Sequence, residues 1–500
     1  MSEEKVSGGK SFTFLQFLVS QKAFFLKRLE TATALIEELK SISTLSQISK
    51  DETILTNLIQ FLPSIKSDQI FDKMLQIIVQ IGRHSMNVEQ IKEYLKQCSN
   101  NSLQRSQKMP SLIKALLEIW NKNGPRFYFS FDGDSSGLRI PCIENWPSSA
   151  YTLCMNFRVE SFEPLQPSTC PFQPRLICFL SKLKGTGLEI LFSSPGKLAV
   201  RTTNQKVAVE FEYEFEAKKW YFIALVHKKN TLSKDELSLF VDGMDLPVCT
   251  KKLEYPSISP ENCDFYIGTN FLLETSFSVT KTKAPFRGQM GAISIFRDAL
   301  GEKQIKSFYQ LAQTHEMISI DALQKKDWIF SSTAQTLFFY NPRISDVDLC
   351  YNYTDYNLEL KSSPNVQKTE KFINKESKLN AIKLPGTSVI VTHDLKTSLY
   401  CGGGFRLILP LFYLLDQPVK IGDEKFDYTI DTSLLPSILE LITKFISSSN
   451  DSFEQMLSLQ GPSLISLFLQ KISPKHFTVE AIDCLSDLVT YLVGQGESVR

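Results

Sequence analysis

The 500-residue sequence lacks most of the features that assign a function directly. None of its ten cysteines belongs to a C-x-x-C pair and there are only five histidines, so we expect no zinc cluster. No stretch approaches the roughly 18 consecutive apolar residues that a membrane-spanning helix needs. The net charge is +1, which gives no reason to expect nucleic acid, an anionic membrane or an acidic substrate as a partner.

A secretory signal is also missing at the N-terminus. The apolar residues between Phe12 and Val19 are interrupted by Gln16 and followed by Gln21 and Lys22, a pattern typical of an amphipathic helix. We therefore expect a cytoplasmic protein without a transmembrane segment.

What the sequence does contain is a globular composition, with 43% apolar, 11% aromatic and 22% charged residues. A single hydrophobic core seldom serves 500 residues, so about two to four domains are expected. Helical and strand periodicities divide the chain into four parts, namely 1–124, 125–300, 301–380 and 381–500.

The first and last parts carry apolar residues at helical spacing. Examples are Ile70–Ile81 and Leu112–Trp120 in the first part, and Leu434–Ile446 and Val479–Val493 in the last. Broad apolar stripes on short helices predict two armadillo-like helical segments, in which each helix packs against neighbours on two sides. We also expect Val389–Leu415 to be largely helical. The sequence ends on an apolar helix, which is abrupt because solenoids normally finish with a polar capping repeat.

At Arg126 the apolar period changes from about 3.6 residues to about 2. Residues Tyr151–Val159 and Val207–Phe215 alternate between apolar and polar positions, which predicts half-buried strands. Leu188–Phe192 and Leu198–Thr202 flank a Ser-Pro-Gly turn, as in a hairpin. Several short strands separated by turns predict an antiparallel β-sandwich in the second part. The third part is then a connector that starts with a short helix.

Two sets of motifs resemble a known family. The runs KWYFIALVHKK, LSLFVDGMDLPV and DFYIGTN between Lys219 and Phe296 resemble a laminin-G-like or concanavalin A-like sandwich. Joined to RFYFSFDGDSSGLRIPCIENWPSSAYTLCMNFRVE (Arg126–Glu160) and VTHDLKTSLYCGGGFRLILPLFYLLDQP (Val391–Pro418), they resemble the region upstream of the BEACH domain in neurobeachin-type BEACH proteins. That family places a concanavalin A-like sandwich between armadillo-like helices. The resemblance covers roughly residues 126–450.

The resemblance implies a multidomain α and β protein that acts as a non-enzymatic cytoplasmic scaffold in membrane and vesicle trafficking. Its expected partners are proteins at vesicle or organelle surfaces, and no cofactor is implied. The sequence departs from the family because it holds no recognisable BEACH domain, pleckstrin-like domain or WD repeats. It is therefore either a fragment of a longer protein or a shortened family member, and functions of those domains are not carried over.

An enzymatic alternative rests on the acidic strand Glu210-Phe-Glu-Tyr-Glu214. Some glucanases with this sandwich architecture use E-x-D-x-E on one strand, where one carboxylate acts as nucleophile and another as acid/base. A glycan-acting hydrolase would use Glu210 and Glu214. Here the middle residue is Glu212 and the run continues to Glu216, which favours an ordinary solvated sheet face.

Three other motifs suggest chemistry but have simpler structural explanations. A calcium site at the sandwich rim would need several converging oxygens, and the candidate carboxylates are Asp132, Asp134, Asp242 and Asp245. A hairpin turn explains Asp242 equally well. Gly402–Gly404 is not a phosphate loop and predicts a tight corner between helices. In His393-Asp394, the aspartate fits a helix N-cap better than a catalytic pair. We predict no catalytic residue and no metal ligand.

Candidate binding residues come from loop length alone. The loops Phe162–Phe172 and Leu272–Ala284 are long enough to carry a site, and Lys281 and Lys283 are the candidate ligand-binding residues. A further alternative is a membrane-surface adaptor, in which lysines at strand ends bind anionic lipids.

Overall fold

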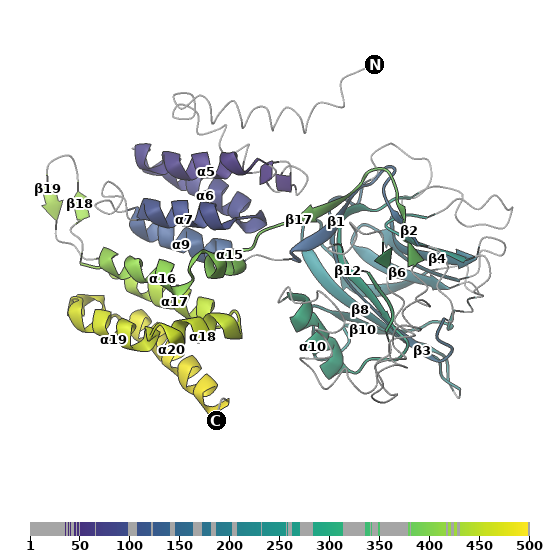
Figure 1. The fold of residues 1–500 in the computed structure, drawn as a ribbon. Helices are drawn as coiled ribbons and strands as arrows, with labels where there is room; N and C mark the ends of the chain where they lie inside the picture. Colours follow the sequence, from purple (N-terminus) through teal and green to yellow (C-terminus); the bar gives the residue numbers. More distant parts are fainter. Residues whose placement is uncertain are drawn as a thin grey trace, which may run out of the picture. The chain divides into compact units, whose positions relative to one another are not determined.

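A computed structural model of the protein divides the chain into two compact units (Figure 1). The first unit combines Met1–Asn123 with Thr392–Arg500, and the second is Gly124–Val391. The structure describes most of residues 36–98, 108–140, 146–163, 173–313, 336–350 and 379–498, with shorter gaps inside these ranges. Among these residues, no helix is long and apolar enough to cross a bilayer.

The first unit is helical. Its described elements before the second unit are α5 (Glu52–Phe61), η1 (Leu62–Ser64), α6 (Asp68–His84), α7 (Val88–Cys98) and α9 (Met109–Trp120). After the second unit come α15 (Leu395–Gly402), α16 (Phe405–Ile408), η4 (Leu409–Leu414), the hairpin β18 (Val419–Ile421) and β19 (Lys425–Asp427), α17 (Leu434–Ile446), α18 (Asn450–Ser458), α19 (Gly461–Lys471), η5 (Pro474–His476) and α20 (Val479–Ser498). These bounds confirm the helices predicted from apolar spacing in both parts of the sequence.

The helices stack in two rows that run through both halves of the unit (Figure 1). Helices α6, α9, α17 and α20 each contact the next in that order. Beside them, α5 contacts α7, α7 contacts α15, and the row continues through α16, α18 and α19. Helices stacked in this order form an α-solenoid. The stack continues without interruption from the helices that precede the sandwich in the sequence to those that follow it.

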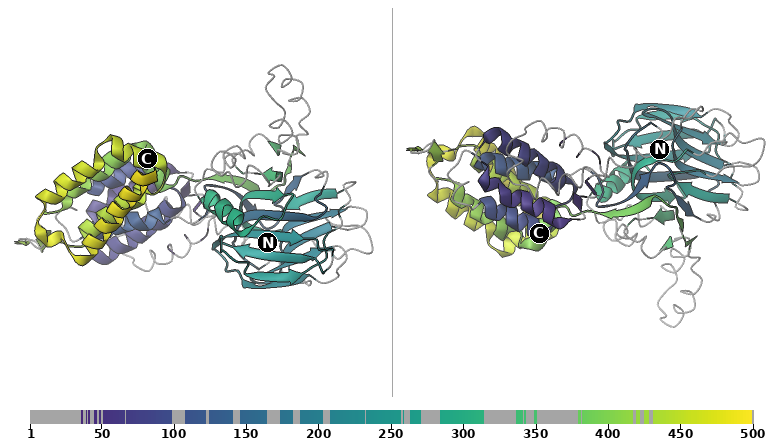
Figure 2. Two further views of the ribbon diagram at one scale, coloured as in Figure 1. Left: turned by 90° about the horizontal axis from the view of Figure 1, so that it is seen from below. Right: turned by 90° about the horizontal axis from the view of Figure 1, so that it is seen from above.

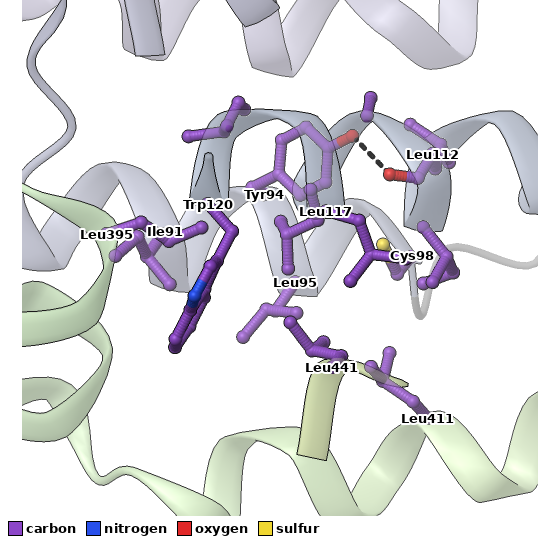
Figure 3. Packing of buried hydrophobic residues seen from close by; sticks show 14 of the residues in the cluster. Ile91, Tyr94, Leu95, Cys98, Leu112, Leu117, Trp120, Leu395, Leu411 and Leu441 are labelled. Atoms are coloured by element: carbon purple, nitrogen blue, oxygen red, sulfur yellow. Dashed lines mark hydrogen bonds between the residues drawn. The ribbon is translucent and has the colours of Figure 1, made fainter. Parts of the chain in front are cut away.

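One hydrophobic core holds both halves of this unit together (Figure 3). Leu95, Leu117 and Trp120 from the first half lie in the same buried cluster as Leu411 and Leu441 from the second. The sequence predicts two helical segments, and the structure joins them into a single packed body. Their association is therefore part of folding, since neither half closes the core alone.

The second unit is a β-sandwich of two antiparallel sheets (Figure 2), as predicted. The first sheet has the strand order β10-β9-β8-β3-β12-β1-β17, with β13 also paired to β12, and the second has the order β16-β2-β11-β4-β5-β6-β7. The strand bounds are β1 (Phe127–Asp132), β2 (Leu138–Ile140), β3 (Ala150–Val159), β4 (Arg175–Ser181), β5 (Gly187–Ser194), β6 (Lys197–Thr202), β7 (Val209–Glu214), β8 (Trp220–Lys228), β9 (Glu236–Val241), β10 (Cys249–Lys252), β11 (Cys263–Ile267), β12 (Arg287–Phe296), β13 (Thr336–Tyr340), β16 (Ile382–Lys383) and β17 (Thr387–Val391). A separate two-stranded ribbon pairs β14 (Leu349–Cys350) with β15 (Leu379–Asn380).

The sandwich core lies between the sheets and is rich in aromatic rings, among them Phe157, Phe179 and Phe265. The helix predicted after the last core strand is α10 (Glu302–Gln313). Its Ile305 and Phe308 cover apolar side chains on the other face of the first sheet, including Phe222. That sheet is therefore buried on both faces where α10 lies.

The segment that leaves the sandwich corrects one prediction. Val389–Val391 belong to strand β17, although the sequence places Val389 at the start of a helical stretch. Four of the five residues from Thr387 to Val391 are β-branched, which favours a strand, and β1 offers this strand a free edge. The ladder pairs Phe127 with Val391, so the chain enters and leaves the sandwich on neighbouring strands.

Candidate functional site

The acidic strand that suggested a hydrolase is β7, at the edge of its sheet. Glu210, Glu212 and Glu214 all point to solvent. Lys251 Nζ donates to Glu212 Oε1, and this bond lowers the pKa of the Glu212 carboxyl. Lys197 Nζ lies 3.9 Å from Glu214 Oε2. A catalytic acid needs a raised pKa. Glu212 and Glu214 each lie beside a lysine and Glu210 is exposed, as on a solvated sheet face.

Three of the four aspartates proposed for calcium have carboxylates that make other contacts, and the fourth, Asp134, is exposed. Asp132 Oδ1 accepts hydrogen bonds from three backbone N–H groups of the following turn, at 2.9–3.2 Å. Asp242 Oδ1 accepts from Phe222 N–H at 2.8 Å, and burial raises the pKa of the Asp242 carboxyl. Lys306 Nζ lies 2.6 Å from Asp245 Oδ1. Within the described part of the chain, no group of three or more His, Cys, Asp or Glu side chains is placed to hold a metal ion.

The motif around residue 394 is structural, as predicted. Asp394 Oδ1 accepts from Thr397 N–H at 2.8 Å and caps helix α15. Gly403 and Gly404 have positive φ angles of 135° and 60°, which form the corner between α15 and α16. A Cβ on Gly404 would stand 1.7 Å from Gln455 Oε1, but this is the end of a flexible side chain that can move, so the positive φ is the reason for glycine here.

A fully buried histidine sits at one end of the sandwich. His227 Nε2 lies 2.9 Å from the carbonyl oxygen of Leu253, and Nδ1 lies 3.1 Å from the Tyr151 hydroxyl. Because a carbonyl can only accept, Nε2 carries the proton and Nδ1 accepts from the tyrosine. Burial lowers the pKa of His227, so the ring is neutral in the folded protein.

This burial predicts a pH-dependent stability of the sandwich. The unfolded chain binds a proton at the ordinary His pKa of 6.5, whereas the folded state resists protonation. Stability is therefore complete above pH 6.5 and falls as the pH drops below it, by up to about 1.4 kcal/mol at pH 5.5. Calorimetry of wild type and His227→Gln between pH 5 and 8 checks this. An equal pH dependence in both proteins would contradict the role of His227.

Sequence reasoning missed a group of three buried charges on the second sheet. Arg175, Glu189 and Arg201 stand side by side on β4, β5 and β6, and each is at least about nine-tenths buried. Glu189 Oε1 lies 3.4 Å from Arg175 Nε, and Oε2 accepts from Arg201 Nε at 2.8 Å. One carboxylate thus serves two guanidinium groups. The only signal in the sequence is a polar residue at an alternating strand position, which also fits a solvated face.

The binding candidates Lys281 and Lys283 lie outside the described residues, as does most of the two long loops that suggested them. Helix α20 is notable for a different reason, the exposure of its apolar side chains. Four of its apolar side chains are exposed, namely Val479, Ile482, Val489 and Val493. Their spacing of three, seven and four residues places them on one side of the helix.

Family models match parts of both units. Residues 132–306 match the family model "Concanavalin A-like lectin/glucanases superfamily". Residues 374–499 match the model "Neurobeachin/BDCP, DUF4704 alpha solenoid region". A Caenorhabditis elegans protein that carries the name neurobeachin homolog is 27% identical over 84% of this chain. The chain is similar to neurobeachin-type BEACH proteins over most of its length.

Other relatives have the same pattern. The "BEACH domain-containing protein B" of Arabidopsis thaliana is 24% identical over 86% of this chain. The chain spans 16% of the length of each of these two BEACH-family relatives. Among solved structures, domains LG4-5 of the mouse laminin alpha1 chain align with 34% of this chain and 41% of their own, at 17% identity and a TM-score of 0.24.

Proposed function

We propose that this chain is a non-enzymatic scaffold that binds protein partners on the cytoplasmic side of vesicle or organelle membranes. The observation that carries the proposal is the continuous helical stack of the first unit, because stacked helices create extended surfaces for other proteins. The similarity to BEACH proteins supports it. The lysine-paired β7 carboxylates weigh against the glycan hydrolase.

Vesicle recruitment tests this proposal against its alternatives. The chain is mixed with a vesicle fraction from its source organism, with the same vesicles after protease treatment, and with protein-free liposomes rich in phosphatidylserine. We expect the chain to float with native vesicles only, because the partners are proteins. Salt-sensitive binding to the protein-free liposomes would instead identify a lipid adaptor.

The same protein preparation is incubated with a panel of β-glucans. We expect no hydrolysis. Product that forms with the wild type and disappears in Glu210→Gln would replace the scaffold proposal with the hydrolase.

A further inference from the structure

The charges buried on the second sheet of the sandwich do not balance. Arg175 and Arg201 both contact the single carboxylate of Glu189, which stands directly opposite Arg201 in the ladder. Their side chains are 4% exposed for Arg175, 5% for Glu189 and 10% for Arg201. We call these three residues the triad. Because guanidinium groups stay protonated in proteins, two cations and one anion leave the triad with one unmatched positive charge.

The described part of the chain does not supply the missing negative charge. Among the described residues, no carboxylate other than that of Glu189 lies within salt-bridge distance of either guanidinium group. The neighbouring strand β7 carries Glu210, but Glu210 is exposed and stands opposite Ala199 in the ladder. Arg158 is equally buried in the first sheet, and there it pairs with a carboxylate of its own, that of Glu160. The triad is therefore one anion short.

The guanidinium group of Arg201 also has a hydrogen-bond donor that is not used. Its Nε donates to Glu189 Oε2 at 2.8 Å, whereas Nη2 lies 2.6 Å from the same oxygen without the geometry of a hydrogen bond. Nη2 is buried and has no acceptor among the described residues. A buried donor in this state is unfavourable, because it has lost its hydrogen bonds to water. Since the Arg201 side chain is still 10% exposed, a small acceptor can reach it from the surface.

We propose that the triad binds the carboxylate group of a small organic acid. One carboxylate supplies one negative charge, which balances the charge of the triad. Its two oxygens match the fork of a guanidinium group, and such hydrogen bonds are strong where water is excluded. A phosphate dianion fits less well, since it would leave the site with a net negative charge. The site lies within the sandwich, and the proposal goes beyond the scaffold function without depending on it.

Acetate is the probe, and saturation-transfer NMR of its methyl signal detects weak binding to the full chain. Sodium chloride keeps the ionic strength constant, because chloride has the same charge as acetate but lacks the pair of oxygens. We expect saturable binding with a Kd below about 10 mM. Formate should displace acetate, whereas phosphate at pH 8 should displace it at least about tenfold less well.

Matched variants locate the acetate. Arg175→Gln and Arg201→Gln each leave one arginine beside Glu189, so the charges balance without a ligand. Each variant should bind acetate at least about tenfold more weakly than the wild type. Lys197→Gln is the control, because Lys197 is a partly exposed cation on β6, the strand that carries Arg201. This control should bind acetate like the wild type, and circular dichroism confirms that each variant is folded.

Three outcomes overturn the proposal. Acetate binding that both glutamine variants retain would place the ligand elsewhere. A folded wild type without saturable binding would remove the site. Phosphate that displaces acetate as well as formate does would remove the assignment to carboxylates. If one glutamine variant fails to fold, the other decides. If both fail, urea unfolding of the wild type decides, since acetate should raise the midpoint above its value in chloride, and an equal midpoint would contradict the proposal.

Discussion

Residues 392–500 expressed alone are expected to remain unfolded, although they include most of the segment that matches the solenoid family model. In the intact chain, Leu395, Leu411 and Leu441 are buried in one cluster with residues from α7 and α9. Without those helices, this apolar surface faces water and the fragment loses a large part of its core. Short helices contribute little stability in isolation, so the fragment should be disordered or aggregate.

The companion experiment removes the sandwich and keeps both halves of the helical unit. Residues 1–123 are joined to 392–500 by a linker of about eight Gly and Ser residues, which extends to about 26 Å. This length is sufficient because Phe127 and Val391 are direct partners in one ladder, where paired Cα atoms stand about 5 Å apart. We expect this chain to unfold cooperatively, since the described residues of the helical core include none from the sandwich.

Circular dichroism and urea denaturation of the two proteins check the prediction. The sandwich alone, residues 124–391, is the positive control, because its core is also drawn from its own unit. A cooperative transition in the 392–500 fragment would contradict the shared core. An unfolded linker chain would mean that the helical unit depends on the sandwich for its stability.

Some parts of this fold can be predicted from the sequence and others cannot. The sandwich is predictable because alternation such as Tyr151–Val159 is a local signal, and the helices are predictable for the same reason. The packing of the two helical segments into one core is not predictable in this way. Leu95 and Leu441 share one core across hundreds of residues, and no periodicity records which distant stripes meet.

Local signals fail in two other places. The sequence assigns Val389 to a helix because its apolar spacing is ambiguous over a short run, and only the open edge of β1 decides for a strand. Glu189 is a lone polar residue in an apolar run, which fits solvent exposure equally well. The register that sets Glu189 opposite Arg201 depends on how three strands align.

Replacing Glu189 by Gln should destabilise the sandwich by about 3–5 kcal/mol, the usual cost of leaving buried charges without their partner. The substitution preserves size but removes the negative charge between two guanidinium groups. Arg175 and Arg201 would then face each other in a buried site, where their side chains are only 4% and 10% exposed. The new amide nitrogen is also a donor beside donors, so at least one hydrogen bond is lost.

Two further variants separate charge from packing. Glu214→Gln removes a carboxylate from an exposed pair with Lys197 and should cost less than about 1 kcal/mol. The triple variant Arg175→Met, Glu189→Leu and Arg201→Met removes all three charges together, and we expect it to be neutral or more stable than wild type because no ion then needs solvation. The free energy of unfolding of the sandwich is measured in denaturant for all three proteins. If Glu189→Gln costs no more than Glu214→Gln, the triad is solvated and its charges are not balanced within the sheet. If the triple variant is as unstable as the single one, the loss comes from packing and not from unpaired charge.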